Sequence, residues 1–339
     1  MSKRKLPIGI IGAGRIGAVH AETLAFRLPE AAPLIIADVN RPAAEKVAAR
    51  CGIPRVSESA EQVIADPQIE AVLICSSTDT HSDLIVEAAR AGKHIFCEKP
   101  IDHSLEKIDR ALAAVKRAGV QLQIGFNRRF DPSFARVRKA VESGEIGEPY
   151  LLHIISRDPE PPPISYVKVS GGMFLDMTIH DFDMARFLMG SEVGEVFTAA
   201  GVRVDPLIGE AGDLDTAVVL LRFKNGAIGT IDNCRKAVYG YDQRVEILGS
   251  DGAIATGNCY PNQAVVSTAN AIRKDLPLHF FMDRYAESYA NELQAFVKAV
   301  SEGSPTPVSG IDGRIPVVMG LAARKSHDEH RAVALEEIH

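Results

Sequence analysis

Short aliphatic runs alternate with longer runs of helical periodicity over the first 125 residues. In the longer runs apolar side chains recur every three or four positions, as they do on one face of an α-helix. Strands and helices that alternate in this way predict right-handed βαβ units and a parallel sheet covered by helices on both faces. The predicted strands are residues 8–11, 34–38, 70–75, 94–97 and 121–125, and the predicted helices are residues 15–27, 41–50, 58–65, 80–91 and 104–118.

A different pattern follows Gly125, where apolar and polar positions alternate within strand-like runs that are joined by short turns. The turn Lys224-Asn225-Gly226 is a strong hairpin signal. This pattern predicts an antiparallel sheet, so we expect two domains, residues 1–125 and 126–339. The predicted strands are a run ending at Arg157 and residues 196–204, 216–223, 227–233, 243–249 and 264–268, with helices near 282–301 and 312–330 and a candidate last strand at 332–336.

The stretch 171–187, GGMFLDMTIHDFDMARF, is predicted to contain one apolar helix. Asp176 and His180 are four residues apart, so on a continuous helix they would share a face. A polar pair on an apolar face is costly to bury unless both partners are engaged. Proton transfer is the favoured interpretation, whereas a metal site that includes Asp183 and a purely structural hydrogen bond remain alternatives.

A glycine-rich turn follows the first predicted strand and opens the first helix. Its sequence, Gly12-Ala13-Gly14-Arg15-Ile16-Gly17, fits the dinucleotide pattern G-x-G-x-x-G in the structural context that the pattern requires. In that pattern the first glycine permits a tight turn, the second admits the pyrophosphate, and the third allows the helix to pack closely on the strand. The free N–H groups at the start of the helix would then face the phosphates.

Asp38 stands at the end of the second predicted strand, about 20 residues beyond the last glycine, where an acidic side chain binds the ribose 2′-hydroxyl. A carboxylate at this position repels a 2′-phosphate, so NAD is favoured over NADP. Arg41 leaves some tolerance of NADP open. Asp38 could also serve as an N-cap for the helix that begins near Pro42.

Two more polar groups follow predicted parallel strands at their carboxyl ends, where ligands bind in such sheets. Ser76 and Thr78 offer hydroxyls to a ribose or phosphate. Alternatively, Thr78 or Asp79 caps the next helix, and His81 is expected to be structural. Glu98-Lys99-Pro100 follows the fifth predicted strand, so Lys99 is expected to point toward the cofactor crevice. A charged surface loop is the alternative for Lys99.

The bulk composition narrows the class of protein. A net charge of −6 argues against a nucleic-acid partner or an anionic membrane surface. The apolar run near the start is short and broken by Pro7 and Gly9, so it is not expected to be a signal peptide, and no stretch has the ~20 apolar residues of a membrane span. The five cysteines are scattered, and we expect a cytoplasmic protein.

Together these motifs resemble the Gfo/Idh/MocA family of nicotinamide-dependent sugar and polyol oxidoreductases. The resemblance rests on the glycine turn, Asp38, Glu98-Lys99-Pro100 and the Asp176-x-x-x-His180 pair, and it covers nearly the whole chain. The segments GFNRRFDPSF, SRDP and YGYDQR, together with the stretch 171–187, resemble inositol 2-dehydrogenases in particular.

The resemblance implies an α/β protein with an N-terminal Rossmann domain and a C-terminal α/β domain that contains a large, mostly antiparallel sheet. It also implies homotetramers that commonly pack through the open face of that sheet. The catalytic residues that it implies match Lys99, Asp176 and His180. We expect NAD to be bound by Gly12, Gly14, Arg15, Ile16, Gly17, Asp38, Ser76, Thr78, His81, Glu98 and Lys99, and a small polyol by Lys99, Asn127, Arg128, Asp158, Asp176, His180 and Tyr241.

Oxidation of a secondary alcohol requires a base for the hydroxyl proton and stabilisation of the developing alkoxide. His180 is the best candidate base, because an imidazole titrates near neutral pH. Lys99 would polarise the reacting oxygen, and Asp176 would either orient His180 or bind a neighbouring hydroxyl. This chemistry needs no metal, so we expect none.

The leading hypothesis is NAD-dependent oxidation of myo-inositol at C2 to the inosose, in inositol catabolism. Another inositol isomer or a pyranose is an alternative substrate, since Ser156 stands where some inositol dehydrogenases have histidine. An NAD-using glycosidase and a non-catalytic nucleotide sensor are further alternatives. Intact Lys99, Asp176 and His180 argue against the sensor.

Overall fold

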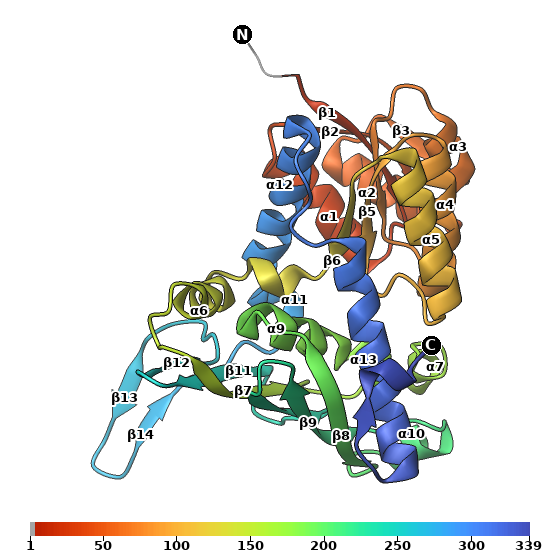
Figure 1. The fold of residues 1–339 in the computed structure, drawn as a ribbon. Coiled ribbons are helices and arrows are strands. Elements are labelled where there is room, and N and C mark those ends of the chain that lie inside the picture. Colours follow the sequence, from red (N-terminus) through yellow and green to blue (C-terminus); the bar gives the residue numbers. More distant parts are fainter. Residues whose placement is uncertain (1–3) are drawn as a thin grey trace. The chain divides into compact units, whose positions relative to one another are not determined.

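The computed structural model describes residues 4–339 and contains two compact units (Figure 1). The first unit comprises residues up to Phe130 together with Glu287–Val317, and the second comprises Asp131–Ala286 together with Val318–His339. Residues 287–317, which the sequence pattern assigned to the second domain, therefore pack with the first unit. The physical reason is that Leu293 and Phe296 join the hydrophobic core of that unit.

The first unit contains a six-stranded parallel sheet with the strand order β3-β2-β1-β4-β5-β6, the order of a dinucleotide-binding Rossmann domain. The predicted parallel sheet is confirmed, and β3 is a short strand that the pattern did not predict. The strands are β1 (Leu6–Ile11), β2 (Ala31–Ala37), β3 (Arg55–Ser57), β4 (Ala71–Ile74), β5 (His94–Glu98) and β6 (Leu122–Gly125). The helices are α1 (Arg15–Phe26), α2 (Arg41–Cys51), α3 (Ala60–Ala65), α4 (Thr78–Arg90), α5 (Leu105–Ala118), the 3₁₀ helix η1 (Asn127–Phe130), and α12 (Ala286–Glu302) from Glu287 onward.

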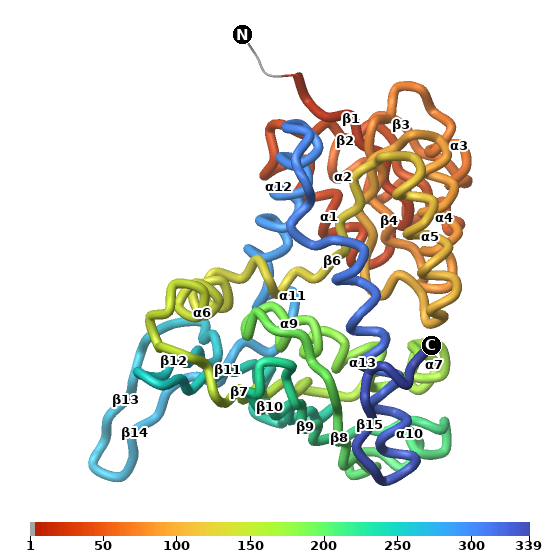
Figure 2. Tube along the Cα trace, viewed as in Figure 1, coloured from red at the N-terminus to blue at the C-terminus, as the bar shows by residue number. Residues whose placement is uncertain are grey.

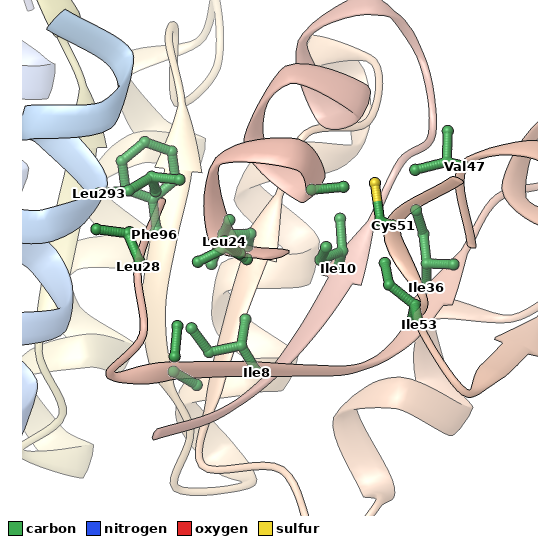
Figure 3. Close-up of a cluster of buried hydrophobic side chains, with 14 of the residues drawn as sticks. Ile8, Ile10, Leu24, Leu28, Ile36, Val47, Cys51, Ile53, Phe96 and Leu293 are labelled. Atoms are coloured by element: carbon green, nitrogen blue, oxygen red, sulfur yellow. The ribbon is translucent and has the colours of Figure 1, made fainter. Parts of the chain in front are cut away.

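Aliphatic side chains from both ends of the chain fill the core of the first unit (Figure 3). Ile10 in β1 and Leu24 in α1 are almost completely buried, and Leu293 from α12 lies in the same cluster. Full burial of one such side chain contributes about 1.5–3 kcal/mol. Strands that are covered on both faces must be aliphatic throughout, which explains the unbroken apolar runs in the sequence.

The second unit contains a seven-stranded sheet with the order β12-β11-β7-β10-β9-β8-β15. Only β7 and β10 pair in parallel, so the sheet is mixed but mostly antiparallel, as expected. The predicted hairpin is confirmed, because β9 and β10 are antiparallel and Gly226 in their turn has φ +93°. The strands are β7 (Pro149–Arg157), β8 (Val193–Gly201), β9 (Thr216–Phe223), β10 (Ile228–Cys234), β11 (Asp242–Gly249), β12 (Ala253–Thr256) and β15 (Val333–Ala334).

Helices α6 and α9 pack against strands of this sheet and against each other. A separate hairpin of β13 and β14 projects from the second unit with all its strand residues exposed (Figure 2). Helix α13 begins in the first unit and ends in the second. The remaining elements are α6 (Pro132–Glu142), α7 (Ile164–Val167), α8 (Met173–Asp176), α9 (Ile179–Met189), α10 (Pro206–Glu210), β13 (Val265–Ser267), β14 (Ile272–Lys274), α11 (Phe281–Arg284), α13 (Gly310–Glu329) and the 3₁₀ helix η2 (Leu335–Glu337).

The prediction of one continuous helix within the stretch 171–187 is wrong. Asp176 is the last residue of α8, and His180 is the second residue of α9. Between the helices the regular backbone bonding is lost, since the N–H of Thr178 donates to Met173 O five residues back and that of His180 to Met177 O three residues back. The buried side-chain hydroxyl of Thr178 donates a hydrogen bond to Asn233 in β10 at 2.6 Å. This bond holds the chain at the interruption between α8 and α9.

Candidate active site

The glycine turn of the first unit has the geometry of a phosphate cradle. Gly12 has φ +103°, and a Cβ on it would lie 2.5 Å from the backbone of Cys75. A Cβ on Gly17 would lie 2.1 Å from Gly12 O, whereas one on Gly14 would meet nothing within 4 Å. Gly14 is also the N-cap of α1 and supplies no side-chain cap. These features fit a dinucleotide whose pyrophosphate approaches Gly14 and the first N–H groups of α1.

Asp38 is half-buried directly after β2 and holds the start of this turn. Its Oδ2 accepts a hydrogen bond from the N–H of Ala13 at 2.6 Å, and its Oδ1 accepts one from Asn40 at 2.7 Å. The N-cap of α2 is Asn40, so the alternative of Asp38 as the cap residue is wrong. Arg41 donates hydrogen bonds to the carboxylates of Glu45 and Glu58 and so forms ion pairs with both.

The polar residues after β4 form a compact turn. Ser76 and Thr80 share a hydrogen bond of 2.6 Å between their hydroxyls. Ser77, rather than Thr78, is the N-cap of α4, and Thr78 is the first residue of the helix. His81 is almost completely buried, and its two ring nitrogens lie 2.8 Å from Pro100 O and 3.0 Å from Ser76 O. It therefore joins the loop after β4 to the loop after β5.

Lys99 is half-buried and follows β5 directly. The residue before it, Glu98, is held by His20 of α1, whose Nε2 lies 2.6 Å from Glu98 Oε1. His20 is fully buried and packs edge-on against Phe96 and Tyr289, with ring centroids 5.1 and 5.7 Å away. The contact between His20 and Glu98 was not predicted from the sequence. The one available signal is that His20 lies three positions after Gly17, on the face of α1 that turns toward the sheet.

One group of three potential metal ligands is present among residues 4–339, and it lies in the first unit. It consists of His20, Glu98 and Glu292, with one ligand atom from each within 4.8 Å of the others. The alternative metal site that the sequence suggested, on Asp176, His180 and Asp183, is not such a group.

Asn127 and Arg128 lie in the 3₁₀ helix η1 immediately after β6, and both are buried. The next residue, Arg129, donates to Asp312 at 3.0 Å. Burial opposes ionisation of Asp312, but the charge of Arg129 and hydrogen bonds from Ser309 outweigh it and lower the pKa of the carboxyl. The turn that positions Asn127 and Arg128 is therefore anchored by an ion pair within the first unit.

In the second unit the carboxylate of Asp176 is held on both oxygens. The hydroxyl of Tyr166 donates to its Oδ1 at 2.8 Å, and Nη1 of Arg235 donates to its Oδ2 at 3.2 Å. His180 is half-buried at the start of α9. Its neighbour Asp181 is fully buried and accepts from Asn233 at 2.9 Å.

The other substrate candidates of the second unit lie around the ends of β7 and β11. Asp158 follows β7, and its backbone carbonyl accepts from Ala237 at 2.6 Å. Ser156, near the end of the same strand, is fully buried and donates to Gln243 at 3.2 Å. Tyr241 is buried and packs edge-on against Tyr285, with their ring centroids 6.0 Å apart.

Asp242, beside Tyr241, anchors this region. It is fully buried and accepts hydrogen bonds from Arg244, Tyr239 and Asn258. Burial works against its ionisation, yet these three donors outweigh that effect and lower the pKa of the Asp242 carboxyl.

Each unit thus brings together a coherent part of the predicted site. The first unit gathers the glycine turn, Asp38, the residues after β4, and Glu98-Lys99, whereas the second gathers Asp176 and His180 with Tyr166 and Arg235. Tyr166 and Arg235 were not predicted, because no sequence pattern links Asp176 to residues 10 and 59 positions away.

Comparison with known proteins agrees with this division. Residues 6–126 match a family model described as an oxidoreductase family with an NAD-binding Rossmann fold, and residues 134–255 match the Gfo/Idh/MocA C-terminal domain. The chain belongs to the Gfo/Idh/MocA oxidoreductase family. It is an NAD-dependent oxidoreductase, and the glycine turn and Asp38 fit that cofactor.

Individual relatives are similar over nearly the full chain. The myo-inositol 2-dehydrogenase of Thermotoga maritima is 50% identical and is matched over 98% of this chain and 99% of its own length. A crystal structure of a probable dehydrogenase from Thermotoga maritima has a TM-score of 0.97 at 50% identity, over 98% of this chain and 100% of that one. The scyllo-inositol dehydrogenase of Lactobacillus casei, with NAD(H) and scyllo-inositol bound, has a TM-score of 0.92 at 29% identity, over 98% of this chain and 100% of that one.

From residue 4 onward, no helix combines the length and the apolar character that crossing a membrane requires.

Proposed function

We propose that this enzyme oxidises myo-inositol at C2 to the corresponding inosose. The observation that carries the proposal is the 50% identity with a myo-inositol 2-dehydrogenase over 98% of the chain. When bound, NAD⁺ supplies the acceptor for the hydrogen that leaves the carbon with its electron pair. The chain supplies the groups that bind the polyol, take the hydroxyl proton and stabilise the alkoxide.

We assign the role of base to His180 and the role of polarising cation to Lys99. The neutral imidazole accepts a proton near neutral pH, and an ammonium beside the reacting oxygen favours its negatively charged form. The holding of Asp176 by Tyr166 and Arg235 supports a role in which a fixed carboxylate orients either His180 or a substrate hydroxyl. Asn127, Arg128, Asp158 and Tyr241 are the remaining proposed polyol contacts.

The proposed roles predict that Lys99→Ala and His180→Ala each lower kcat by at least about 10²-fold, in the range expected for a group that transfers a proton or stabilises charge. Binding of NADH, measured by titration of its fluorescence, is expected to change little in His180→Ala, because His180 is not among the proposed cofactor contacts. A normal kcat in either variant would contradict the role assigned to that residue.

Two alternative functions can be distinguished from this proposal by experiment. The relative from Lactobacillus casei is a scyllo-inositol dehydrogenase with scyllo-inositol bound, so another inositol isomer is the nearest alternative. An NAD-using glycosidase is the second.

The test is NADH formation with NAD⁺ and a panel of myo-inositol, scyllo-inositol, other inositol isomers, glucose and nitrophenyl glycosides. The proposal expects the highest kcat/KM with myo-inositol and one NADH for each molecule oxidised. A higher kcat/KM with another isomer would assign that isomer, and release of nitrophenol without net NADH would assign a glycosidase.

We further propose that the enzyme is a cytoplasmic homotetramer associated through the open face of the second sheet. Several large apolar side chains of that sheet are exposed, which supports a covered surface: Tyr150, Phe197, Val218, Leu220, Ile228 and Leu248. The free state of all five cysteines is in keeping with a reducing compartment.

A further inference from the structure

Arg235 is one of the largest completely buried side chains of the protein, and it is charged. It follows β10, and its backbone N–H donates to Asp215 O at 2.8 Å. Its guanidinium lies between two carboxylates, with Nη1 at 3.2 Å from Asp176 Oδ2 and Nη2 at 3.7 Å from Asp213 Oδ2. Burial of a cation is costly unless carboxylates compensate its charge, so this placement ties Arg235 to both aspartates.

The two aspartates lie at opposite ends of α8. Asp213 Oδ1 accepts a hydrogen bond from the N–H of Met173, the first residue of the helix, at 2.9 Å. Asp176 is the last residue of the same helix. The preceding Gly172 has φ +82°, and a Cβ there would lie 2.8 Å from Asp213 Oδ1, so Asp213 and the start of the helix are in close contact. Arg235 therefore links the start of α8 to its end.

The second residue that contacts Asp176, Tyr166, is exposed to solvent, unlike Arg235. Tyr166, at 47% exposure, lies at the surface in α7 and donates its hydroxyl to Asp176 Oδ1 at 2.8 Å. Arg235 is buried and offers the planar guanidinium that suits a carboxylate partner. Because the two donors bind different oxygens of Asp176, together they restrict the plane of its carboxylate.

We propose that Arg235 is a positioning residue for the oxidation reaction, and that it acts by holding the Asp176 carboxylate in the orientation that catalysis uses. The inference rests on the proposed function, in which Asp176 belongs to the catalytic group. Tyr166 serves the same carboxylate from the solvent side, as the weaker of the two holders.

The test compares Arg235→Met, Arg235→Lys and Tyr166→Phe with the wild type in the inositol assay. Arg235→Met removes the positive charge and the hydrogen-bond donors of the guanidinium. We expect kcat to fall about 10²-fold, the size of effect that misplacement of a reacting group produces. Arg235→Lys keeps the charge and is expected to recover part of that loss. Tyr166→Phe is expected to lower kcat about three- to tenfold, and the KM for NAD⁺ should stay within about twofold in all three.

The matched control is Arg186→Met, which removes a buried arginine from an ion pair with Glu192 at the far end of α9. If Arg235 is only structural, its variants and Arg186→Met should lose activity in proportion to their loss of thermal stability. The proposal predicts a loss of kcat in the Arg235 and Tyr166 variants at temperatures where each protein is fully folded.

A double-mutant cycle with Asp176→Asn tests whether Arg235 influences kcat through Asp176. If Arg235 acts through Asp176, Arg235→Lys lowers kcat in the wild-type background and changes it less than twofold in the Asp176→Asn background. Equal losses in the two backgrounds would overturn the proposal, as would an Arg235→Met enzyme with unchanged kcat. An inactive wild type across the whole polyol panel would instead overturn the proposed function, so the two failures are distinguishable.

If Arg235→Met does not fold, the surface variant Tyr166→Phe and the conservative Arg235→Lys still decide the matter. A crystal structure of Arg235→Lys is expected to show a changed rotamer or weaker density for the Asp176 side chain. An unmoved carboxylate together with wild-type kcat in both variants would overturn the proposal.

Discussion

At the scale of single residues, two buried histidines hold the segment that carries Lys99. His20 binds the side chain of Glu98, the residue before it, and His81 binds the backbone carbonyl of Pro100, the residue after it. Both imidazoles are almost completely buried, so neither contact competes with water. A lysine on a loop would otherwise sample many positions, and these two contacts restrict its backbone on each side.

Asp38 allows a prediction about cofactor choice at the same scale. Its carboxylate accepts hydrogen bonds from the N–H groups of Ala13 and Asn40. As a ribose ligand it would repel a 2′-phosphate. We expect Asp38→Ser to raise the KM for NAD⁺ and to increase the ratio of kcat/KM for NADP⁺ over NAD⁺ at least about tenfold. Initial rates with each cofactor at saturating polyol measure the ratio.

The control for this prediction is Asp66→Ser, which removes an aspartate at the C-cap of α3 that likewise accepts a backbone N–H, from Gln68. That variant should leave the ratio unchanged. If Asp38→Ser also leaves the ratio of NADP⁺ to NAD⁺ efficiency unchanged, Asp38 supports the glycine turn but does not select between the two cofactors.

At the scale of elements, a buried polar network places the start of α9. Thr178 donates to Asn233 Oδ1, and the amide nitrogen of Asn233 donates to Asp181 and to the carbonyl of Ser156 in β7. All four residues are completely buried. One asparagine on β10 therefore fixes both the interruption before α9 and the first turn of that helix, where His180 lies.

We expect Asn233→Ala to lower the free energy of unfolding by about 2–4 kcal/mol, because it leaves the buried Thr178 hydroxyl without its acceptor and takes a donor from Asp181. Urea denaturation followed by circular dichroism measures the change. Asn270→Ala, in the exposed turn between β13 and β14, is the control and should cost less than about 0.5 kcal/mol. A loss below about 1 kcal/mol for Asn233→Ala would show that the network does not determine the stability of this region.

The same network shows why some elements could be predicted from the sequence and others could not. Strands β1 and β4 are buried on both faces, so their aliphatic runs are visible in the chain itself. The break between α8 and α9 depends on a bond from Thr178 to a residue 55 positions away, which no local pattern records. The glycine turn was predictable because its pattern is local, and Asp38 because it stands at the expected distance from that turn in the dinucleotide pattern. Arg235, in contrast, reaches Asp176 only through the folded sheet.

At the scale of the whole molecule, the open face of the second sheet exposes several large apolar side chains. Phe197 in β8 pairs directly with Leu220 in β9, so the two side chains stand on the same face, and they are 41% and 39% exposed. Val218, two residues before Leu220, is 48% exposed on that face. A row of such side chains across neighbouring strands is typical of a surface that another copy covers.

This surface gives the prediction for assembly. The wild type is expected to have about four times the chain mass of 36.6 kDa by light scattering coupled to gel filtration. Leu220→Glu should give smaller species at the same concentration, because association would bury a carboxylate without a partner at a cost of several kcal/mol. Phe26→Glu, which changes a 66% exposed residue of α1, is the control and should leave the mass unchanged. If Leu220→Glu keeps the mass of the wild type, or if Phe26→Glu loses it, the subunits do not associate through the face of the second sheet.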